Sequence, residues 1–326
     1  MKVLFSCHRF PFEASPRGAE LSMQSIIKYL QGEGFNVSGY KSDLPTGTYS
    51  GFPFNTDSLE EMIKASDIVL TWGKAATMTA AMCIKHTKPY ILMVRWWRNV
   101  QPPPPGDLLN RHRDKAHIEK HRFIFENAKA IITNSDYSTL VIESYYNTPA
   151  ITSYVPIEGE ADNIANPDGA LTIVSPNQNL GEWQLAVDIS KHTNEKLLIV
   201  NYPKGEEPFY KALENVELMP YVTDMKQVWR KTKILLKPIY HNDICGTTRV
   251  TIEAMQHGVP VIATDRSGLK EWAVNLVSPR YDISEWIEWV KVIDNDWLRF
   301  NNQALDIFSR YDTHKNLAIF KKEILK

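Results

Sequence analysis

Residues 237–271 combine small, hydroxylated and acidic residues at spacings that suit the binding of an anionic ligand. Gly246 allows the backbone to approach a ligand closely, and Thr247 and Thr248 can cap the helix that we expect to start beside them. The free amides of that first turn and the positive end of the helix dipole suit a diphosphate. Glu253 follows about two turns into the helix, where a carboxylate can accept hydrogen bonds from both hydroxyls of a ribose. A capped helix with a solvated glutamate explains the same residues equally well when they are taken alone.

A second group of residues that could bind an anion lies at residues 95–122. This segment contains seven lysines and arginines, among them Arg95, Arg111 and Arg113, and it begins beside Trp96. Basic residues interleaved with tryptophan are typical of surfaces that stack bases and neutralise phosphates. They are equally typical of a membrane-proximal or sugar-binding loop. A solvated helix face next to buried tryptophans is the simplest alternative.

The elements that position these segments follow from short apolar runs that alternate with amphipathic segments. Residues 19–31 have one apolar face at helical spacing, and Gly32 and Gly34 end that helix. The expected strands of the first half are residues 3–6, 35–37, 67–71, 90–94 and 130–134. Strands and helices in steady succession predict a parallel sheet with helices on both faces.

A polar, irregular stretch at residues 158–168 interrupts this alternation, and we interpret it as a linker between domains. The alternation then restarts, with a helix expected at residues 314–325. The expected strands after the linker are residues 171–174, 196–200, 216–219, 234–236 and 259–263. The sequence therefore predicts two doubly wound α/β domains, at residues 1–160 and 161–305, and a C-terminal helix within residues 306–326 that packs back on the first domain. Ligands of such folds bind at the carboxyl ends of the strands, here in a cleft between the domains.

The run of twelve residues from Glu253 to Thr264, which reads EAMQHGVPVIAT, carries a family resemblance. It resembles the donor-site signature of retaining GT-B glycosyltransferases, in particular glycosyltransferase family 4. The resemblance implies two Rossmann-like domains that face each other across a cleft. It also implies that Glu253 binds the ribose of a nucleotide-sugar donor, while the turn from Gly258 to Val261 shapes the nucleotide pocket.

The N-terminal half resembles the same family at Arg17, Gly18 and Glu20, which stand where the family has its Gly-Gly-Ala-Glu loop. That loop faces the donor phosphate and the acceptor, so the resemblance implies that Gly18 binds the donor and that Arg17 and Glu20 bind the acceptor. Residues 95–122 lie in the same domain, where the family has its acceptor site, so Arg95, Trp96, Arg111 and Arg113 are further acceptor-site candidates.

The sequence departs from the family pattern at two positions. Cys245 stands where the family has the first of its two glutamates, and Asp243 is the expected replacement. Leu180 stands where the family has a lysine that neutralises the diphosphate, and Arg249 is the best-placed substitute.

Lys204 and Arg266 are further substitutes for that missing lysine. His8 follows the first expected strand, so it should line the cleft, where it could contact the acceptor or the leaving group. A packed or solvated loop residue is an equally good interpretation of His8.

The whole-chain composition favours a soluble globular protein, with 43% hydrophobic and 23% charged residues and a net charge of −1. The three cysteines have no spacing typical of a metal site, and a reducing cytosol is their simplest setting. We expect neither a signal peptide nor a transmembrane segment. The expected location is cytoplasmic, or the host cytoplasm for a protein of phage origin.

These observations lead to the hypothesis of a hexosyl- or pentosyltransferase that uses a nucleotide sugar, UDP-linked by expectation, with retention at the anomeric carbon. The acceptor is a saccharide, a lipid-linked glycan or hydroxylated bases of DNA. No other cofactor and no metal are expected, since the chain has no suitably placed Asp-x-Asp motif. A non-catalytic nucleotide- or sugar-binding protein on the same scaffold is the alternative, and the oligomeric state stays open.

Overall fold

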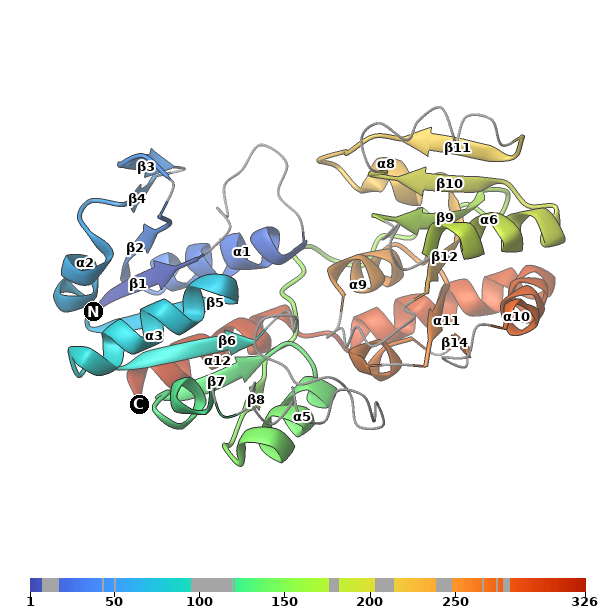
Figure 1. Cartoon of the computed structure of the whole chain (residues 1–326). Helices are drawn as coiled ribbons and strands as arrows, with labels where there is room; N and C mark the ends of the chain where they lie inside the picture. The colour runs from blue at the N-terminus through green and yellow to red at the C-terminus, as the bar shows by residue number, and fades with distance from the viewer. Residues whose placement is uncertain are drawn as a thin grey trace. The chain divides into compact units, whose positions relative to one another are not determined.

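The computed structural model describes residues 1–7, 18–42, 44–49, 51–94, 119, 121–175, 182–202, 214–238, 248–265, 267–273, 275–277 and 282–326 (Figure 1). The chain divides into two compact units. Unit 1 consists of Met1–Pro156 and Thr313–Lys326, and unit 2 consists of Ile157–Asp312. Each unit is built on a sheet of mainly parallel strands, as the alternation of apolar and amphipathic segments predicted.

The sheet of unit 1 has the strand order β3-β4-β2-β1-β5-β6-β7-β8 among the described residues. All pairs are parallel except that of β3 with β4. The strands are β1 (Lys2–Ser6), β2 (Asn36–Tyr40), β3 (Gly47–Tyr49), β4 (Phe52–Phe54), β5 (Ile68–Trp72), β6 (Tyr90–Val94), β7 (Ala130–Thr133) and β8 (Ile151–Thr152). The order reverses between β1 and β5, which makes this pair the topological switch point of the sheet.

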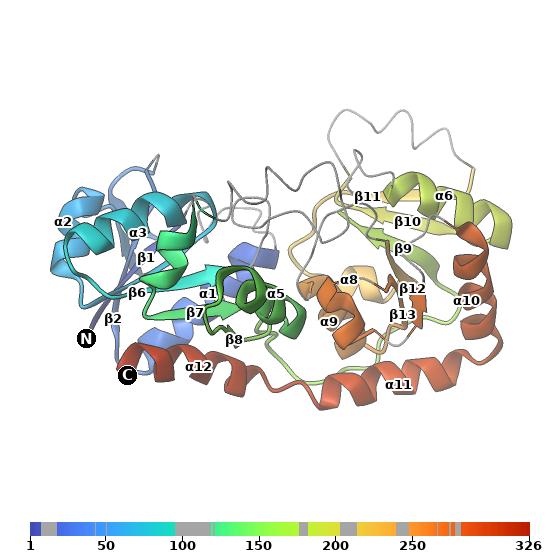
Figure 2. The ribbon, with the colours of Figure 1, turned by 60° about the horizontal axis from the view of Figure 1, so that its bottom comes forward.

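Helices cover both faces of this sheet, and Figure 2 shows α12 on the side opposite α2 and α3. Val3 and Phe5 belong to one core together with Met23 of α1 and Phe320 of α12, while the intervening Leu4 is buried on the other face. Among the described residues, the helices of unit 1 include α1 (Gly18–Gly32), α2 (Leu59–Ala65), α3 (Ala76–Lys85), α5 (Asp136–Tyr146) and α12 (Thr313–Leu325), with a 3₁₀ turn at Gly73–Ala75.

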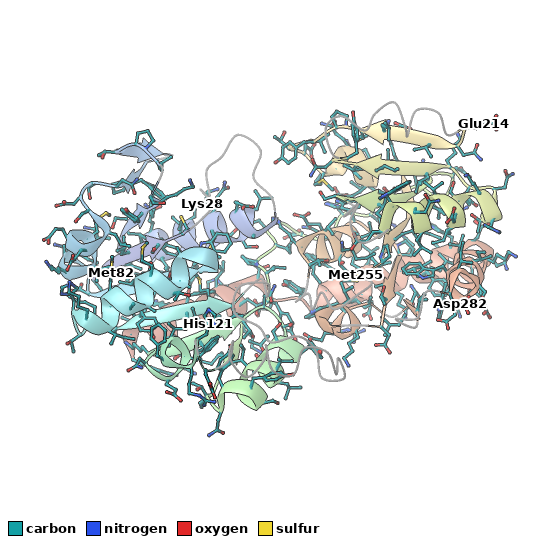
Figure 3. All side chains as sticks on the ribbon, viewed as in Figure 1. Lys28, Met82, His121, Glu214, Met255 and Asp282 are labelled. Carbon is teal, nitrogen blue, oxygen red and sulfur yellow. The ribbon has the colours of Figure 1, made fainter. Side chains whose placement is uncertain are left out.

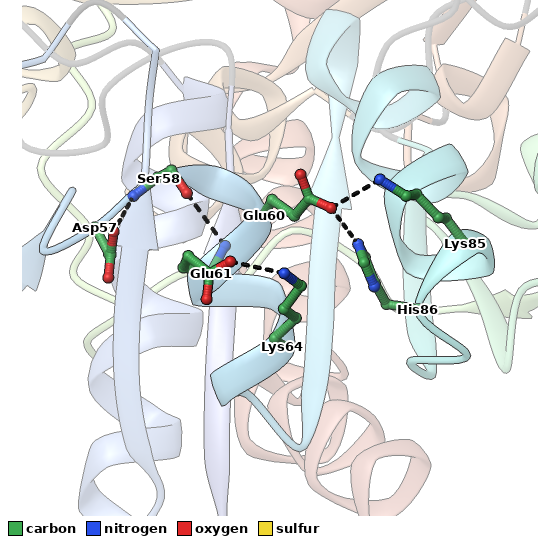
Figure 4. A network of polar contacts seen from close by, with 7 residues as sticks. All are labelled: Asp57, Ser58, Glu60, Glu61, Lys64, Lys85 and His86. Atoms are coloured by element: carbon green, nitrogen blue, oxygen red, sulfur yellow. Dashed lines mark hydrogen bonds and ion pairs between the residues drawn. The ribbon is translucent and has the colours of Figure 1, made fainter.

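A polar network ties α2 to the end of α3 (Figure 4). The carboxylate of Glu60 accepts a hydrogen bond from Lys85 Nζ at 2.8 Å and another from His86 Nε2 at 2.6 Å. These two partners, Lys85 first, lower the pKa of Glu60 to about 2. Ser58 caps α2, because its Oγ accepts a hydrogen bond from the backbone amide of Glu61 at 3.3 Å. The network fixes two neighbouring helices of unit 1 by contacts at the protein surface.

The sheet of unit 2 is parallel throughout and has the order β11-β10-β9-β12-β13-β14 among the described residues. Figure 1 shows the first four of these strands one below the other. The strands are β9 (Ala170–Val174), β10 (Leu197–Val200), β11 (Val216–Met219), β12 (Thr232–Lys237), β13 (Val261–Thr264) and β14 (Asn275–Val277). Numbered within the unit, this order is 3-2-1-4-5-6, the order of the Rossmann fold, with its switch point between β9 and β12.

The helices of unit 2 also cover both sheet faces. Helices α6 and α10 contact each other over a core that includes Leu185 and Trp286, and α11 contacts α9. The helices are α6 (Glu182–Thr193), α8 (Lys226–Trp229), α9 (Arg249–Gln256), α10 (Ile283–Asn295) and α11 (Trp297–Ser309), with a 3₁₀ turn at Ser267–Glu271. The structure therefore confirms every long strand that the sequence predicted, and it adds the short strands β3, β4, β8 and β14.

Candidate functional site

Helix α9 lies at the switch point of unit 2, since it is the helix that follows β12 and β12 pairs with β9. Ligands of doubly wound sheets bind outside the carboxyl ends of the strands at this point. One side of α9 is held by apolar packing through Ile252 and Met255, and Met255 is labelled in Figure 3. The sheet therefore fixes α9 with its N-terminal end following the carboxyl end of β12.

The first turn of α9 has no side-chain cap among the described residues. Thr248 occupies the N-cap position, as the sequence predicted, but its side chain makes no capping hydrogen bond to the backbone within the described residues. Its hydroxyl instead lies 2.6 Å from the hydroxyl of Thr251. The helix begins at Arg249 rather than at Thr247, and its first turn contains no acidic residue. A turn of this kind suits an anionic ligand.

Arg249 and Glu253 form an ion pair one turn apart on α9. Arg249 Nε donates a hydrogen bond to Glu253 Oε1 at 2.6 Å, and the two side chains are 13% and 15% exposed. Burial raises the pKa of Glu253, and the charge and hydrogen bond of Arg249 act in the opposite direction. Glu253 is one turn into the helix, not two, because α9 starts later than the sequence predicted. The two residues that we assigned to separate roles are therefore in direct contact.

The opposite end of α9 is bound to the segment at residues 158–165. Gln256 Nε2 donates hydrogen bonds to the backbone oxygens of Glu158 and Glu160 at 3.0 and 3.1 Å. His257 Nδ1 donates to the backbone oxygen of Asp162 at 3.2 Å, and burial lowers the pKa of His257. Backbone bonds join the same two stretches of chain, since the amide of Asp162 donates to the oxygen of Gln256 at 2.9 Å. This part of the predicted linker is thus fastened to the candidate site helix.

Gly258 follows α9 in a left-handed conformation, with φ at 77°. Its carbonyl oxygen accepts a hydrogen bond from Asn301 Nδ2 at 2.7 Å, and Asn301 and Asn163 exchange two amide hydrogen bonds at 2.9 and 3.0 Å. A Cβ at Gly258 would lie 2.5 Å from Asn301 Nδ2 and 2.6 Å from Asn163 Oδ1. Only glycine fits this turn, for conformational and steric reasons together. The residues that make these contacts are far apart in the chain, so no local pattern could have revealed them.

The switch point of unit 1 carries two further predicted site residues. Gly18 is the first residue of α1, the helix that follows β1, and its carbonyl oxygen accepts a hydrogen bond from Ser22 Oγ at 2.8 Å. Glu20 lies in the first turn of the same helix, where its side chain is buried. A carboxylate in the first turn is favoured by the helix dipole.

Most of the other predicted site residues lie outside the described residues. The structure therefore gives them no position, and their roles stay predictions. They are His8, Arg17, Arg95, Trp96, Arg111, Arg113, Asp243, Gly246 and Thr247, together with Leu180, Lys204, Cys245 and Arg266. Of the predicted donor-site residues, the structure brings Thr248, Arg249 and Glu253 together on one helix.

The described part of the chain contains neither a candidate metal site nor a candidate membrane-spanning helix. No cluster of three or more histidine, cysteine, aspartate or glutamate side chains there could hold a metal ion. Among the same residues, no helix has the length and apolar character needed to cross a membrane.

Comparisons with known proteins agree with this fold. Residues 182–293 match the family model described as "Glycosyl transferases group 1". Curated protein sequences give no match. The structure of Alr3699/HepE from Anabaena, solved with UDP-glucose, is similar with a TM-score of 0.76 at 15% identity, covering 100% of this chain and 99% of that one.

Two other solved structures illustrate the range of similar proteins. Sucrose-phosphate synthase from Thermosynechococcus elongatus has a TM-score of 0.68 at 13% identity, covering 99% of this chain and 96% of that one. An alpha-glucosyltransferase in complex with UDP and a 13-mer DNA containing an HMU base has a TM-score of 0.60 at 10% identity, with 100% of both chains covered. The chain therefore has the GT-B fold of these glycosyltransferases. The residues that match the group 1 glycosyltransferase model all lie within its second unit.

Proposed function

We propose that this glycosyltransferase moves a sugar from a UDP-sugar to a hydroxyl acceptor with retention at the anomeric carbon. The observation that carries the proposal is the ion pair of Arg249 and Glu253 on the first two turns of α9, inside the segment that matches the family model. A buried carboxylate beside a helix N-terminus offers a ribose and a diphosphate adjacent binding groups. The similar structure from Anabaena was solved with UDP-glucose, which supports UDP as the nucleotide.

The proposed reaction needs no nucleophile from the protein. The bond between the anomeric carbon and the diphosphate oxygen breaks, and the acceptor oxygen forms its bond to that carbon on the same face. The acceptor proton passes to the departing diphosphate oxygen, so protons and charges balance. The N-terminal turn of α9 stabilises the diphosphate as it leaves, and such electrostatic stabilisation supplies most of the catalysis. No further cofactor takes part.

Several other side chains have proposed roles in this reaction. Lys204 and Arg266 would neutralise the diphosphate in place of the absent family lysine. Arg249, the third expected substitute, is paired with Glu253. Asp243 would hold a sugar hydroxyl in place of the family's first glutamate, and His8 would contact the acceptor or the leaving group.

The acceptor is a saccharide, a lipid-linked glycan or a hydroxylated base of DNA. Two observations favour testing DNA first. One is the basic, tryptophan-containing sequence of residues 95–122, and the other is the similar fold of the alpha-glucosyltransferase that was solved with DNA. An enzyme acting on a base in a duplex must first rotate that base out of the stack.

A panel of nucleotide sugars tests the proposal directly. The purified protein is incubated with each donor, and free nucleoside diphosphate is measured with and without hydroxylated DNA or saccharide acceptors. We expect release from one UDP-sugar, stimulation by the true acceptor, and a product with the donor's anomeric configuration by NMR. Nucleotide binding by calorimetry without release from any donor would favour the non-catalytic binding protein instead.

A further inference from the structure

The ion pair of Arg249 and Glu253 is arranged unfavourably for the helix that contains it. An i,i+4 pair stabilises a helix best when the acid precedes the base, and here the arginine precedes the glutamate. A cation in the first turn is also opposed by the helix dipole. By contrast, Asp306 precedes Arg310 in the exposed i,i+4 pair at the end of α11, where both preferences are met. Stabilisation of α9 therefore does not explain the position of Arg249.

Glu253 has one oxygen engaged and one available. Oε1 accepts the hydrogen bond from Arg249, and Oε2 has no hydrogen-bond partner within the described residues. An ionised carboxylate accepts hydrogen bonds at both oxygens, whereas a protonated one uses one oxygen as a donor. Binding of a ribose diol, which brings two hydroxyl donors, thus requires Glu253 in its charged form.

Burial works against that charged form, and Arg249 is the group that supports it. Helix α9 contacts α11 and strands β12 and β13. The ionisable side chains of these elements are Lys233 and Lys237 on β12 and Arg299 and Asp306 on α11, and β13 has none. Among the described residues, Arg249 is the one charged group that shifts the pKa of Glu253 downward.

We propose that Arg249 is a positioning residue, whose guanidinium fixes the carboxylate of Glu253 in place and in its charged form so that it accepts the hydroxyls of the donor ribose. This inference rests on the proposed function, because it takes the ligand of Glu253 to be a nucleotide. If Arg249 positions Glu253, binding of the ribose depends on the arginine. If Arg249 instead binds the diphosphate directly, only binding of the diphosphate depends on it.

The test measures the binding of UDP and of uridine to parent, R249M, R249K and R249Q proteins between pH 5 and pH 9. Uridine carries the ribose without the diphosphate. We expect R249M to weaken both ligands by about tenfold near neutral pH, the effect of losing one charge-assisted interaction. The loss should shrink as the pH rises, because Glu253 without its arginine ionises only at higher pH. R249K should restore most of the affinity with a pH profile like that of the parent.

R310M is the matched control, since it removes an exposed i,i+4 pair from α11 and should bind both ligands as the parent does. R249Q repeats the test if R249M does not fold, and circular dichroism checks folding. A loss confined to UDP, with uridine unchanged, would overturn the proposal and assign Arg249 to the diphosphate. Unchanged binding of both ligands by R249M would also overturn the positioning role of Arg249. Donor turnover in the nucleotide-sugar panel tests the proposed function separately, so turnover there would leave that function standing.

Discussion

The two ends of helix α9 differ in how their polar groups are satisfied. At the C-terminal end, Gln256, His257 and Gly258 make hydrogen bonds to residues 158–165 and to Asn301. At the N-terminal end, the cap has no side-chain hydrogen bond to the backbone within the described residues, and a cation stands in the first turn. The C-terminal end therefore anchors the helix within unit 2, and the N-terminal end is the one that we propose binds the ligand. A site built on an element fixed in this way keeps its geometry without adjusting when the ligand binds.

The largest effect should come from breaking the anchored end at Gly258. G258A places a Cβ against the paired amides of Asn301 and Asn163 and forces a left-handed alanine, so we expect a loss of about 3 kcal/mol in the free energy of unfolding. Urea denaturation measures it. G34A is the matched control, because Gly34 has φ at 82° with nothing within 4 Å of its Cβ position, and it should lose only about 1 kcal/mol. Equal losses in the two variants would mean that the amide pair does not restrict the turn.

A smaller loss is expected from Gln256, at the same end of the helix. Q256A removes two hydrogen bonds and leaves the oxygens of Glu158 and Glu160 without that partner, which should cost about 2 kcal/mol. Thermal unfolding followed by circular dichroism, analysed for the free energy, is the measurement. Q184A serves as control, since Gln184 donates to Asp188 one turn away on α6 and its loss should cost about 0.3 kcal/mol. If Q256A lost no more free energy of unfolding than Q184A, the hydrogen bonds of Gln256 would not anchor α9.

The free energy of unfolding should depend on pH through Glu253, near the N-terminal end of α9. Since burial raises the pKa of Glu253, its contribution to stability is fully present below the ordinary glutamate pKa and is lost as the pH rises through the raised value. The stability of E253Q relative to the parent should therefore increase with pH across that window. Denaturant titrations at several pH values test the sign. A difference that stays constant with pH would show that Glu253 is not perturbed in the folded protein.

We expect the smallest effect at Glu60, in the surface network of unit 1. The pKa of this glutamate is lowered, whereas the pKa of Glu253 is raised. The pKa of Glu60 is lowered to about 2, so its contribution is present above the ordinary glutamate pKa and is lost as the pH falls toward 2. E60Q should be slightly less stable than the parent near neutral pH, with a gap that closes in acid. The same titrations measure it, and a gap that widens in acid would contradict the assigned cause.

The sequence predicted much of this fold because buried strands of four or more apolar residues leave runs that can be recognised, as at residues 90–94 and 197–200. Strands of two or three residues leave no such run, which is why β8 and β14 were missed. The spacing of Thr248, Arg249 and Glu253 predicts a site on one helix, and the i,i+4 spacing of the last two also permits the ion pair that the structure shows. The hydrogen bonds of Gln256 span 96 and 98 residues, so only the folded chain reveals them.

We propose that the carboxylate of Glu253 holds the ribose of a nucleotide near the N-terminal end of α9. Calorimetric titration of UDP into parent and E253A proteins tests it most directly. We expect E253A, checked for folding by circular dichroism, to bind UDP more weakly by about 2 kcal/mol, which is roughly a thirtyfold loss of affinity. Unchanged affinity in a folded E253A protein would contradict the account and remove Glu253 from the site.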